Sequence, residues 1–487
     1  MNFATMAKAA ADYTFTENGA LAFNTSGGGS LLDLFANIGG MRKRSDLDII
    51  SQWQAARREN PTLADNLILY ARNIRDGGLG ERRIARILLK QLATNDPEKV
   101  ARNFDTITDC GRWDDLFVLV GTPVESAMWK YVSEQFKSDM AGSMTNKPIS
   151  LLAKWAPSIN TSSQETRNLA KRAITKLGMT PRNYRKMLAK LRRYLNVLES
   201  KISRNDWDSI NFEQVPSLAM KRYLKAFGVH CYEAFGNYKS KLVKGEAKVN
   251  AATLYPYDLV ETCMRYHRTG AYDPIVTEQQ WNSLPNYVDG SFDVVCMADV
   301  SGSMCGRPMA TSIGLSTYFA QRNKGAYHGL YLSFTNNPHF IHIQDNWTLK
   351  QCVEYVENKD VGYNTDLDRA FAAIYNVAQV TKEVPKALII ISDGEIDRWN
   401  RPGDAYCASI AEKWKNKYAA IKLKAPKLIL WNVESRGSNK FLAQSHENVA
   451  YCSGQSAGTF KNLIDLITKD AYTAMCEILS KPEFSWQ

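Results

Sequence analysis

Several patterns that identify common protein classes are missing from this sequence of 487 residues. Its apolar runs are short, such as residues 387–391, whereas a membrane-spanning helix needs about 20 apolar residues. The N-terminus also lacks the apolar core of a signal peptide. The nine cysteines include no CxxC pair, which argues against a disulfide framework and a zinc cage and favours a reducing compartment. We therefore expect a soluble, cytoplasmic protein with no membrane partner.

Signatures of nucleotide binding and of catalysis are missing as well. The sequence contains neither GxxxxGK[ST] nor GxGxxG, and its six histidines include no HExxH. It shows no pattern of a nucleophile with its base, of paired catalytic carboxylates or of a redox centre. We therefore expect a protein that is not an enzyme.

Positive charge, in contrast, is abundant and unevenly distributed. The net charge is +11, of which residues 1–290 carry +10 and residues 291–487 carry +1. Residues 151–250 alone hold 20 basic against 7 acidic side chains. Such a stripe is either a solvated helical surface or a face for a polyanion such as RNA, and we favour the polyanion because like charges repel in the folded state. The candidate RNA contacts are Lys171, Arg172, Lys176, Arg182, Arg185, Lys186, Lys190, Arg192 and Arg193.

The first part of the chain has the periodicity of helices. At this length, two or three domains are expected. Residues 1–30 are polar and glycine-rich, which predicts a flexible N-terminal arm. Over residues 31–272, apolar positions recur at i, i+3, i+4 and i+7, which predicts short antiparallel helices stacked as a degenerate α-helical repeat. Thr180 and Pro181 can begin a helix whose bases recur on more than one face, so we expect it to bury little and to present charge.

The pattern changes after residues 273–290, which we interpret as a linker rich in polar and aromatic residues. Beyond residue 290, apolar runs with strand character alternate with amphipathic helices. Alternation of this kind, with strands that are apolar on both faces, predicts a doubly wound α/β sheet over residues 291–487.

Oxygen-bearing side chains follow the strands of this predicted sheet. The run FDVVCMADVSGSM breaks off into Asp299, Ser301 and Ser303 at the end of the first strand, where such sheets bind ligands. Thr365, in GYNTDLD, and Asp393, in IIISDGE, can reach the same edge. Two carboxylates and three hydroxyls suit Mg²⁺ or Mn²⁺ with waters completing the shell. Because hydroxyls add little charge, we expect modest affinity, and an acidic ligand could complete the coordination.

Each of these fragments alone has a simpler interpretation. Asp-x-Ser-x-Ser can be an Asx turn with a helix cap, and SDGE is a common turn. Their order along the chain, with each fragment at a predicted strand end, favours a cation site.

The same fragments carry a family resemblance. DVSGSM, NTD and ISDGE resemble the metal-ion-dependent adhesion site of von Willebrand factor A domains, in which DxSxS, a threonine and an aspartate coordinate Mg²⁺ directly or through water. The resemblance implies that residues 291–487 form such a Rossmann-like domain. It also implies a set of metal ligands, namely Asp299, Ser301, Ser303, Thr365 and Asp393.

The helical part resembles the TROVE module of Ro autoantigen proteins, and more closely a poorly characterised family that joins a TROVE-like region to a C-terminal von Willebrand A domain. The resemblance covers residues 14–487 and includes NIRDGGLGERR, CGRWDDLF, LLAKWAPSINT and KGEAKVNAATLYPYDLV. In Ro proteins, HEAT-like helical repeats close into a ring clasped by the A domain and bind single-stranded 3′ ends of misfolded RNA and small structured RNAs. The resemblance therefore implies an α + α/β multidomain protein of ribonucleoprotein type.

Several residues of the helical part have structural interpretations. In GRWDDLF we expect Arg112 to pair with a nearby carboxylate and Trp113 to lie in the core. Tyr184, Tyr194 and Tyr223 lie among the bases and could stack on nucleobases, but aromatic residues at helical spacing usually belong to the core.

The leading hypothesis is a non-catalytic RNA-binding protein in which basic helices engage phosphates and a metal-bearing A domain clasps them. One alternative is a protein-interaction adaptor whose metal site captures an acidic residue of a partner, with the basic helices merely solvated. A second alternative is a metal-dependent nuclease.

Overall fold

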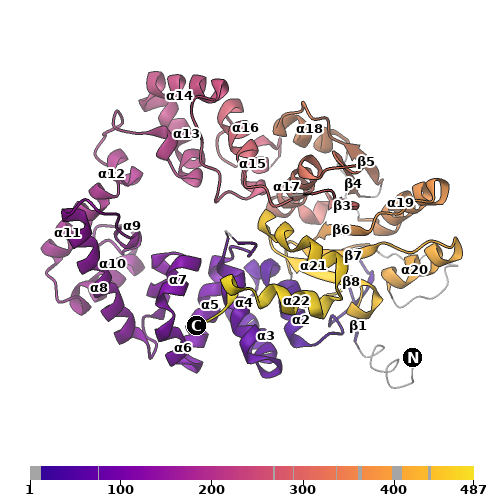
Figure 1. The fold of residues 1–487 in the computed structure, drawn as a ribbon, viewed down its shortest axis with the longest axis horizontal. Helices are drawn as coiled ribbons and strands as arrows, with labels where there is room; N and C mark the ends of the chain where they lie inside the picture. Colours follow the sequence, from indigo (N-terminus) through magenta and orange to yellow (C-terminus); the bar gives the residue numbers. More distant parts are fainter. Residues whose placement is uncertain are drawn as a thin grey trace. The chain divides into compact units, whose positions relative to one another are not determined.

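A computed structural model describes residues 12–74, 76–266, 269–288, 290–335, 337–359, 365–397, 409–436 and 440–487 (Figure 1). A mostly helical region precedes an α/β domain, as the sequence predicted. The chain divides into two compact units. Unit 1 takes in the described residues within 1–84, 216–224 and 249–485, and unit 2 those within 85–215, 225–248 and 486–487.

A six-stranded sheet forms the centre of unit 1, with the strand order β5-β4-β3-β6-β7-β8. The strands are parallel except β5, which pairs antiparallel with β4 at one edge. Every residue of β3 and β6 is buried, as expected for strands covered on both faces. The bounds are β3 (Val294–Asp299), β4 (Leu330–Phe334), β5 (His339–His342), β6 (Ala387–Ser392), β7 (Lys427–Asn432) and β8 (Val449–Ser453).

Helices cover this sheet in the doubly wound manner. The strands β3 and β6 form the central pair of the sheet. On one side of this pair the chain runs from β3 through α17 to β4, and on the other side it runs from β6 through α20 to β7. Because such crossovers are right-handed, these two helices lie on opposite faces. Accordingly, α17 packs with α15 and α18, whereas α20 packs with α19. The bounds are α15 (Pro256–Cys263), α17 (Arg307–Arg322), α18 (Leu349–Lys359), α19 (Leu367–Thr381), α20 (Ile410–Ala420), α21 (Leu463–Thr468) and α22 (Ala471–Leu479).

Residues 12–30 have a fixed place in unit 1, where the sequence predicted a flexible arm. They begin with the antiparallel hairpin of β1 (Tyr13–Phe15) and β2 (Leu21–Phe23). Phe23 and Phe441 exchange two backbone hydrogen bonds of 2.9 and 2.8 Å, and Thr16 Oγ1 donates to the carbonyl of Ile396 at 2.6 Å. The hairpin is ordered because it buries apolar side chains and pairs its backbone with distant segments. The rest of the predicted arm, residues 1–11, lies outside the described residues.

The first helices also belong to unit 1 rather than to a separate helical domain starting at residue 31. The segment α2 packs against β8, and the backbone N–H of Gly39 donates to Ser453 Oγ at 2.9 Å. The N–H of Ser435 donates to the carbonyl of Gly40 at 2.8 Å. These contacts join segments about 400 residues apart, which periodicity cannot reveal. The bounds are α2 (Ser30–Asn37), η1 (Ile38–Lys43), α3 (Asp46–Glu59) and α4 (Pro61–Arg72).

Residues 273–290 are not a simple linker, because they contain the helix α16 (Pro274–Asn282). Asp273 Oδ1 accepts from the N–H groups of Ile275 and Val276, and Pro274 takes the first helical position. The buried Trp281 donates to Gln321 Oε1 at 2.8 Å. The Asp-Pro pair was a start signal for a helix that the sequence interpretation overlooked.

Unit 2 is built from helices and short helical turns. Trp113 is buried and stacks on Tyr131 at 5.7 Å between ring centroids, while Arg112 donates two 3.0 Å hydrogen bonds to Asp114. The structure thus confirms both expectations for GRWDDLF. The bounds are α5 (Arg82–Asn95), α6 (Pro97–Arg102), α7 (Phe104–Cys110), η2 (Trp113–Leu119), α8 (Glu125–Met144), α9 (Leu152–Trp155), α10 (Gln164–Lys176), α11 (Pro181–Tyr194), α12 (Leu198–Ile202), α13 (Ser217–His230) and α14 (Tyr232–Lys244). The first residues of α5 and of α13 belong to unit 1.

In the part of the chain that the structure describes, none of the helices is both long enough and apolar enough to span a membrane.

The close approach of η1 to the end of β8 leaves no room for a side chain at Gly39. A Cβ atom there would lie 2.4 Å from the backbone nitrogen of Gly454, a contact that only a backbone shift could relieve. We expect Gly39→Ala to lower the free energy of unfolding by about 1–3 kcal/mol, as overpacking does. Gly236→Ala is the matched control, because a Cβ at Gly236 in α14 meets nothing within 4 Å. Thermal unfolding of both variants tests this, and equal midpoints would contradict the proposed packing constraint.

Candidate functional site

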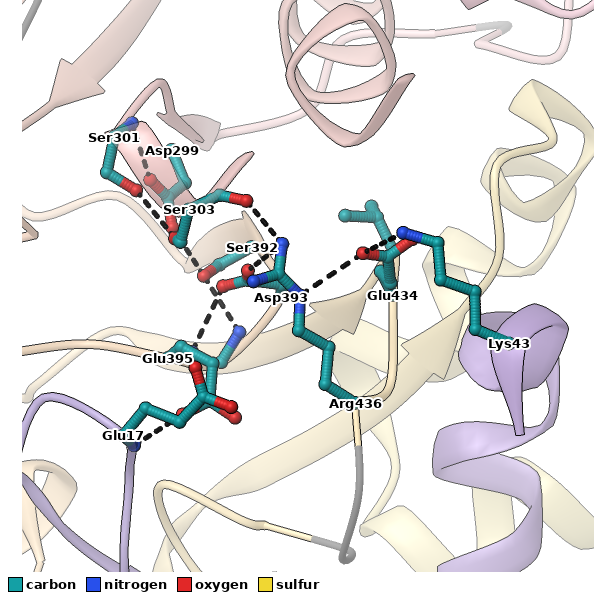
Figure 2. Close-up of polar contacts among 12 residues, drawn as sticks. Glu17, Lys43, Asp299, Ser301, Ser303, Ser392, Asp393, Glu395, Glu434 and Arg436 are labelled. Carbon is teal, nitrogen blue, oxygen red and sulfur yellow. Dashed lines mark hydrogen bonds and ion pairs between the residues drawn. The ribbon is translucent and has the colours of Figure 1, made fainter. Parts of the chain in front are cut away.

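The oxygen-bearing residues lie where the two central strands end. Asp299 is the last residue of β3, and Asp393 directly follows Ser392, the last residue of β6. The two strands are parallel neighbours, with Ala298 opposite Ile391, so both end at the same edge of the sheet. Strand order reverses between them, and such a reversal leaves a crevice in which doubly wound sheets bind ligands. Figure 2 shows these residues side by side.

Asp299 is fully buried and is bound by neutral donors. Its Oδ1 accepts from the backbone N–H of Ser301 at 3.0 Å, and its Oδ2 accepts from Ser392 Oγ at 2.6 Å. Ser301 Oγ and Ser303 Oγ lie 3.1 Å apart. The structure therefore brings together the three residues of the Asp-x-Ser-x-Ser segment. It adds Ser392, which sequence analysis missed although it directly precedes Asp393.

Asp393 has two different oxygen environments. Its Oδ1 accepts from the backbone N–H of Glu395 at 3.1 Å, whereas its Oδ2 lies 3.3 Å from Arg436 Nη2. The same Arg436 donates to the carbonyl of Ser303 and lies 3.2 Å from Glu434 Oε2. Arg436 and Glu434 follow β7 and carried no sequence signal, because nothing in the order of residues places that loop beside Asp393.

Thr365 stands just before α19, and its side chain is buried. Its N–H donates to Asp397 Oδ2 at 2.9 Å, and the N–H of Asp397 donates back to the carbonyl of Thr365 at 3.0 Å. These bonds hold Thr365 beside the segment that follows Asp393. Its Oγ1 has no hydrogen-bond partner in the described part of the chain and makes no direct bond to the other four predicted ligands.

The electrostatics of this cluster favour a bound cation. Burial and the neighbouring charge of Asp393 raise the pKa of Asp299 above its usual value, and burial likewise raises the pKa of Asp393. A buried carboxylate without a cationic partner is costly, and a buried hydroxyl without a partner is also unfavourable. Two carboxylates and three hydroxyls are hard-oxygen donors that fit Mg²⁺ or Mn²⁺. Among the described residues, no group of three His, Cys, Asp or Glu side chains could hold a metal, so a site here would depend on the hydroxyls.

The predicted RNA contacts lie on α10 and α11 in unit 2. In α11, the buried side chains Tyr184, Met187, Leu188 and Leu191 share one face. The exposed bases at 182, 186, 190 and 193 follow helical spacing on the opposite face, and Arg185 and Arg192 lie beside them. The helix thus buries one complete face, whereas the sequence predicted that it would bury little. Seven predicted contacts are exposed and form no ion pair with a described residue, namely Lys171, Lys176, Arg182, Arg185, Lys186, Lys190 and Arg193.

Two predicted contacts have structural roles instead. Arg172 forms a double hydrogen bond with the carboxylate of Glu125 on α8 and lowers the pKa of that carboxyl. Arg192 is half-buried and donates to the carbonyls of Ala153 and Ala156 and to Ser158 Oγ, at 2.8, 2.9 and 2.9 Å. The sequence analysis assigned both arginines to the charged surface, because their partners lie more than 30 residues away along the chain and cannot be recognised from composition.

The three tyrosines among the bases differ in burial. Tyr184 is buried and donates to the carbonyl of Pro157 at 2.9 Å. Tyr194 is half-buried and donates to the carbonyl of Lys147 at 2.8 Å, and Tyr223, in unit 1, is also half-buried. The core interpretation is therefore confirmed for Tyr184.

Comparisons with known proteins give relatives without a described function. Residues 126–290 match a family described as a domain of unknown function (DUF2828), and residues 293–478 match another (DUF7788). An uncharacterized protein of Acanthamoeba polyphaga mimivirus is 29% identical over 498 residues, covering 93% of this chain and 85% of that protein. The crystal structure of the Deinococcus radiodurans RO (RSR) protein gives a TM-score of 0.33 at 13% identity, covering 77% of this chain and 93% of that one.

The contacts of Arg192 predict a loss of stability that its neighbours do not share. Arg192→Ala leaves three acceptors at the end of α9 without their donor. We expect it to lower the free energy of unfolding by about 2 kcal/mol. Lys190→Ala, on the exposed face of the same helix, should change it by no more than about 0.5 kcal/mol. Urea denaturation followed by circular dichroism compares the two, and equal effects would show that Arg192 is only a surface charge.

Proposed function

We propose that this chain is a non-catalytic RNA-binding protein, in which the exposed bases of α10 and α11 bind phosphates and the sheet domain holds Mg²⁺ or Mn²⁺. The observation that carries the proposal is the set of seven exposed bases on α10 and α11 without ion-pair partners among the described residues. The TROVE-like segments of the sequence point to the same class of ligand, a single-stranded or small structured RNA.

The exposed bases of α10 and α11 carry charge that no described residue compensates. Like charges on one helix face repel each other, and the neighbours that could have neutralised them are absent among the described residues. A phosphate backbone would neutralise them and release its own counterions, which favours binding. Flexible Lys and Arg side chains on an exposed helix position a nucleic acid without reading its bases. We therefore propose binding that depends weakly on RNA sequence.

The metal part of the proposal names five ligands. Asp299, Ser301, Ser303, Thr365 and Asp393 would hold the ion, with waters completing the shell. When bound, the ion would supply a positive charge that attracts an anionic group of a ligand. Ser392 and the N–H of Ser301 orient the carboxylate of Asp299, and the N–H of Glu395 orients that of Asp393.

The metal assignment predicts a specific loss of binding. Asp299→Asn keeps the shape of the side chain but removes its charge, so we expect Mn²⁺ binding to fall below detection. Asp345→Asn is the matched control, because the Asp345 side chain is 84% exposed and pairs with His328. Electron paramagnetic resonance of free Mn²⁺ during titration gives the affinity, and circular dichroism confirms folding. Undiminished binding by the Asp299 variant would refute the metal assignment.

The RNA assignment predicts an effect of charge reversal on α11. Lys186→Glu with Lys190→Glu should weaken binding of single-stranded RNA at least about tenfold, or about 1.4 kcal/mol. Lys415→Glu with Lys424→Glu makes the same change in net charge on exposed residues of unit 1 and should have little effect. Fluorescence anisotropy at one fixed salt concentration measures both affinities.

Salt dependence provides a second measurement of the same face. If about five phosphates are neutralised, log affinity should fall against log salt with a slope of about −3.5 for single-stranded RNA. A slope near zero, or equal losses in both double variants, would reject the α11 face and favour a protein partner. RNA that shortens when Mg²⁺ is added would instead indicate a nuclease.

A further inference from the structure

Arg436 connects the candidate metal centre to charged residues from other parts of unit 1. It lies after β7, and its Nη2 donates to the carbonyl of Ser303 and lies 3.3 Å from Asp393 Oδ2. On its other side, Nε lies 3.2 Å from Glu434 Oε2, and Glu434 Oε1 lies 2.9 Å from Lys43 Nζ. Figure 2 shows this series of alternating charges leading from Lys43 to Asp393.

The contact with Asp393 uses the oxygen that a metal ion would also use. Asp393 Oδ1 already accepts from the N–H of Glu395 at 3.1 Å. Asp393 Oδ2 is buried and accepts no hydrogen bond from a described residue. The guanidinium of Arg436 is its positively charged neighbour. A cation at this oxygen and the guanidinium would therefore compete for one carboxylate oxygen, and their like charges would repel at short range.

Arg436 can leave Asp393 and still keep its ion pair with Glu434, although its Nη2 then also gives up the carbonyl of Ser303. Its side chain is 30% exposed, whereas that of Asp393 is fully buried and that of Glu434 is 7% exposed. Glu434 holds the guanidinium through Nε, which is not the nitrogen that faces Asp393. The arginine could therefore turn toward Glu434 and solvent while the two carboxylates stay in place.

We propose that Arg436 is an internal competitor for the cation at Asp393 and so sets the metal affinity of the site. This inference rests on the proposed metal centre. Arg436 offsets the charge of Asp393, and a divalent ion must displace it in order to bind. Glu434 limits this competition, because it holds the guanidinium from the opposite side. Lys43 pairs with Glu434 and does not contact Asp393, so its charge acts on the site only indirectly.

The test compares Mn²⁺ affinities of full-length variants at one pH and ionic strength. Arg436→Gln removes the competing charge and should tighten Mn²⁺ binding by about fivefold, because a partly exposed ion pair changes an equilibrium by about this factor. Arg436→Lys keeps the charge and should stay within about twofold of the unsubstituted protein. Lys43→Met is the matched control, because it removes a positive charge that does not touch Asp393, and it should leave the affinity unchanged.

A second variant, with the opposite expected effect on Mn²⁺ affinity, serves as the test if Arg436→Gln does not fold. Glu434→Gln releases the guanidinium from its second carboxylate, so its pair with Asp393 should strengthen and Mn²⁺ binding should weaken.

The possible outcomes separate this inference from the metal assignment. Tighter binding by Arg436→Gln alone supports the competition. Equal or weaker binding by that variant overturns it and makes Arg436 a positioning residue for the Ser303 loop. Equal gains for Arg436→Gln and Lys43→Met overturn it in favour of a general charge effect. If the unsubstituted protein and every variant fail to bind Mn²⁺, the metal centre itself is refuted, and the competition is refuted with it.

Discussion

The parallel pairing of β3 with β6 is the constraint on which the candidate metal centre depends. Five residues of each strand, 294–298 and 387–391, pair in register. All of them are buried, so a slip of register would misplace apolar side chains on both faces of the sheet. The pairing fixes Asp299 beside Ser392, although 93 residues separate them in the chain. The reversal of strand order at this point keeps the crossover helices from closing the same edge.

Buried acids around this edge are matched with partners from distant segments. Glu395 pairs with Lys440 and also accepts from the backbone N–H of Glu17 in the N-terminal hairpin. Glu434 pairs with Lys43 and Arg436, and Asp393 pairs with Arg436. Asp299 differs, because the described residues give it serine hydroxyl and backbone donors and no cation. Since an unpaired buried charge is costly, Asp299 is the residue at which an added cation would gain most.

In unit 2, burial of the acceptors likewise decides which basic side chains bind to the protein itself. Arg172 and Arg192, which lie near buried acceptors, are used to join helices. The remaining predicted bases stand on solvent-facing positions and form no ion pairs with described residues. A surplus of charge in the sequence therefore overstates the surface available to a polyanion, and the contacts of each side chain decide which residues contribute to it. The surface that remains is narrower than composition implies but more regular, because one helix face carries most of it.

The sequence by itself determined that a helical region precedes an α/β domain, the doubly wound class of the sheet and four of the metal-site candidates that the structure brings together. These follow from local rules, since periodicity and strand-end position depend on neighbouring residues. The sequence also predicted that Thr365 lies near Asp393, and the structure holds Thr365 beside the segment after Asp393 through its hydrogen bond with Asp397. Only tertiary structure decided that the N-terminal hairpin packs against residues 396 and 441, that Arg192 caps a helix end, and that Arg436 faces Asp393. Each of these contacts joins segments separated by tens to hundreds of residues. The polar groups involved could equally face solvent, so their sequence neighbours do not show that folding brings a partner within hydrogen-bond distance.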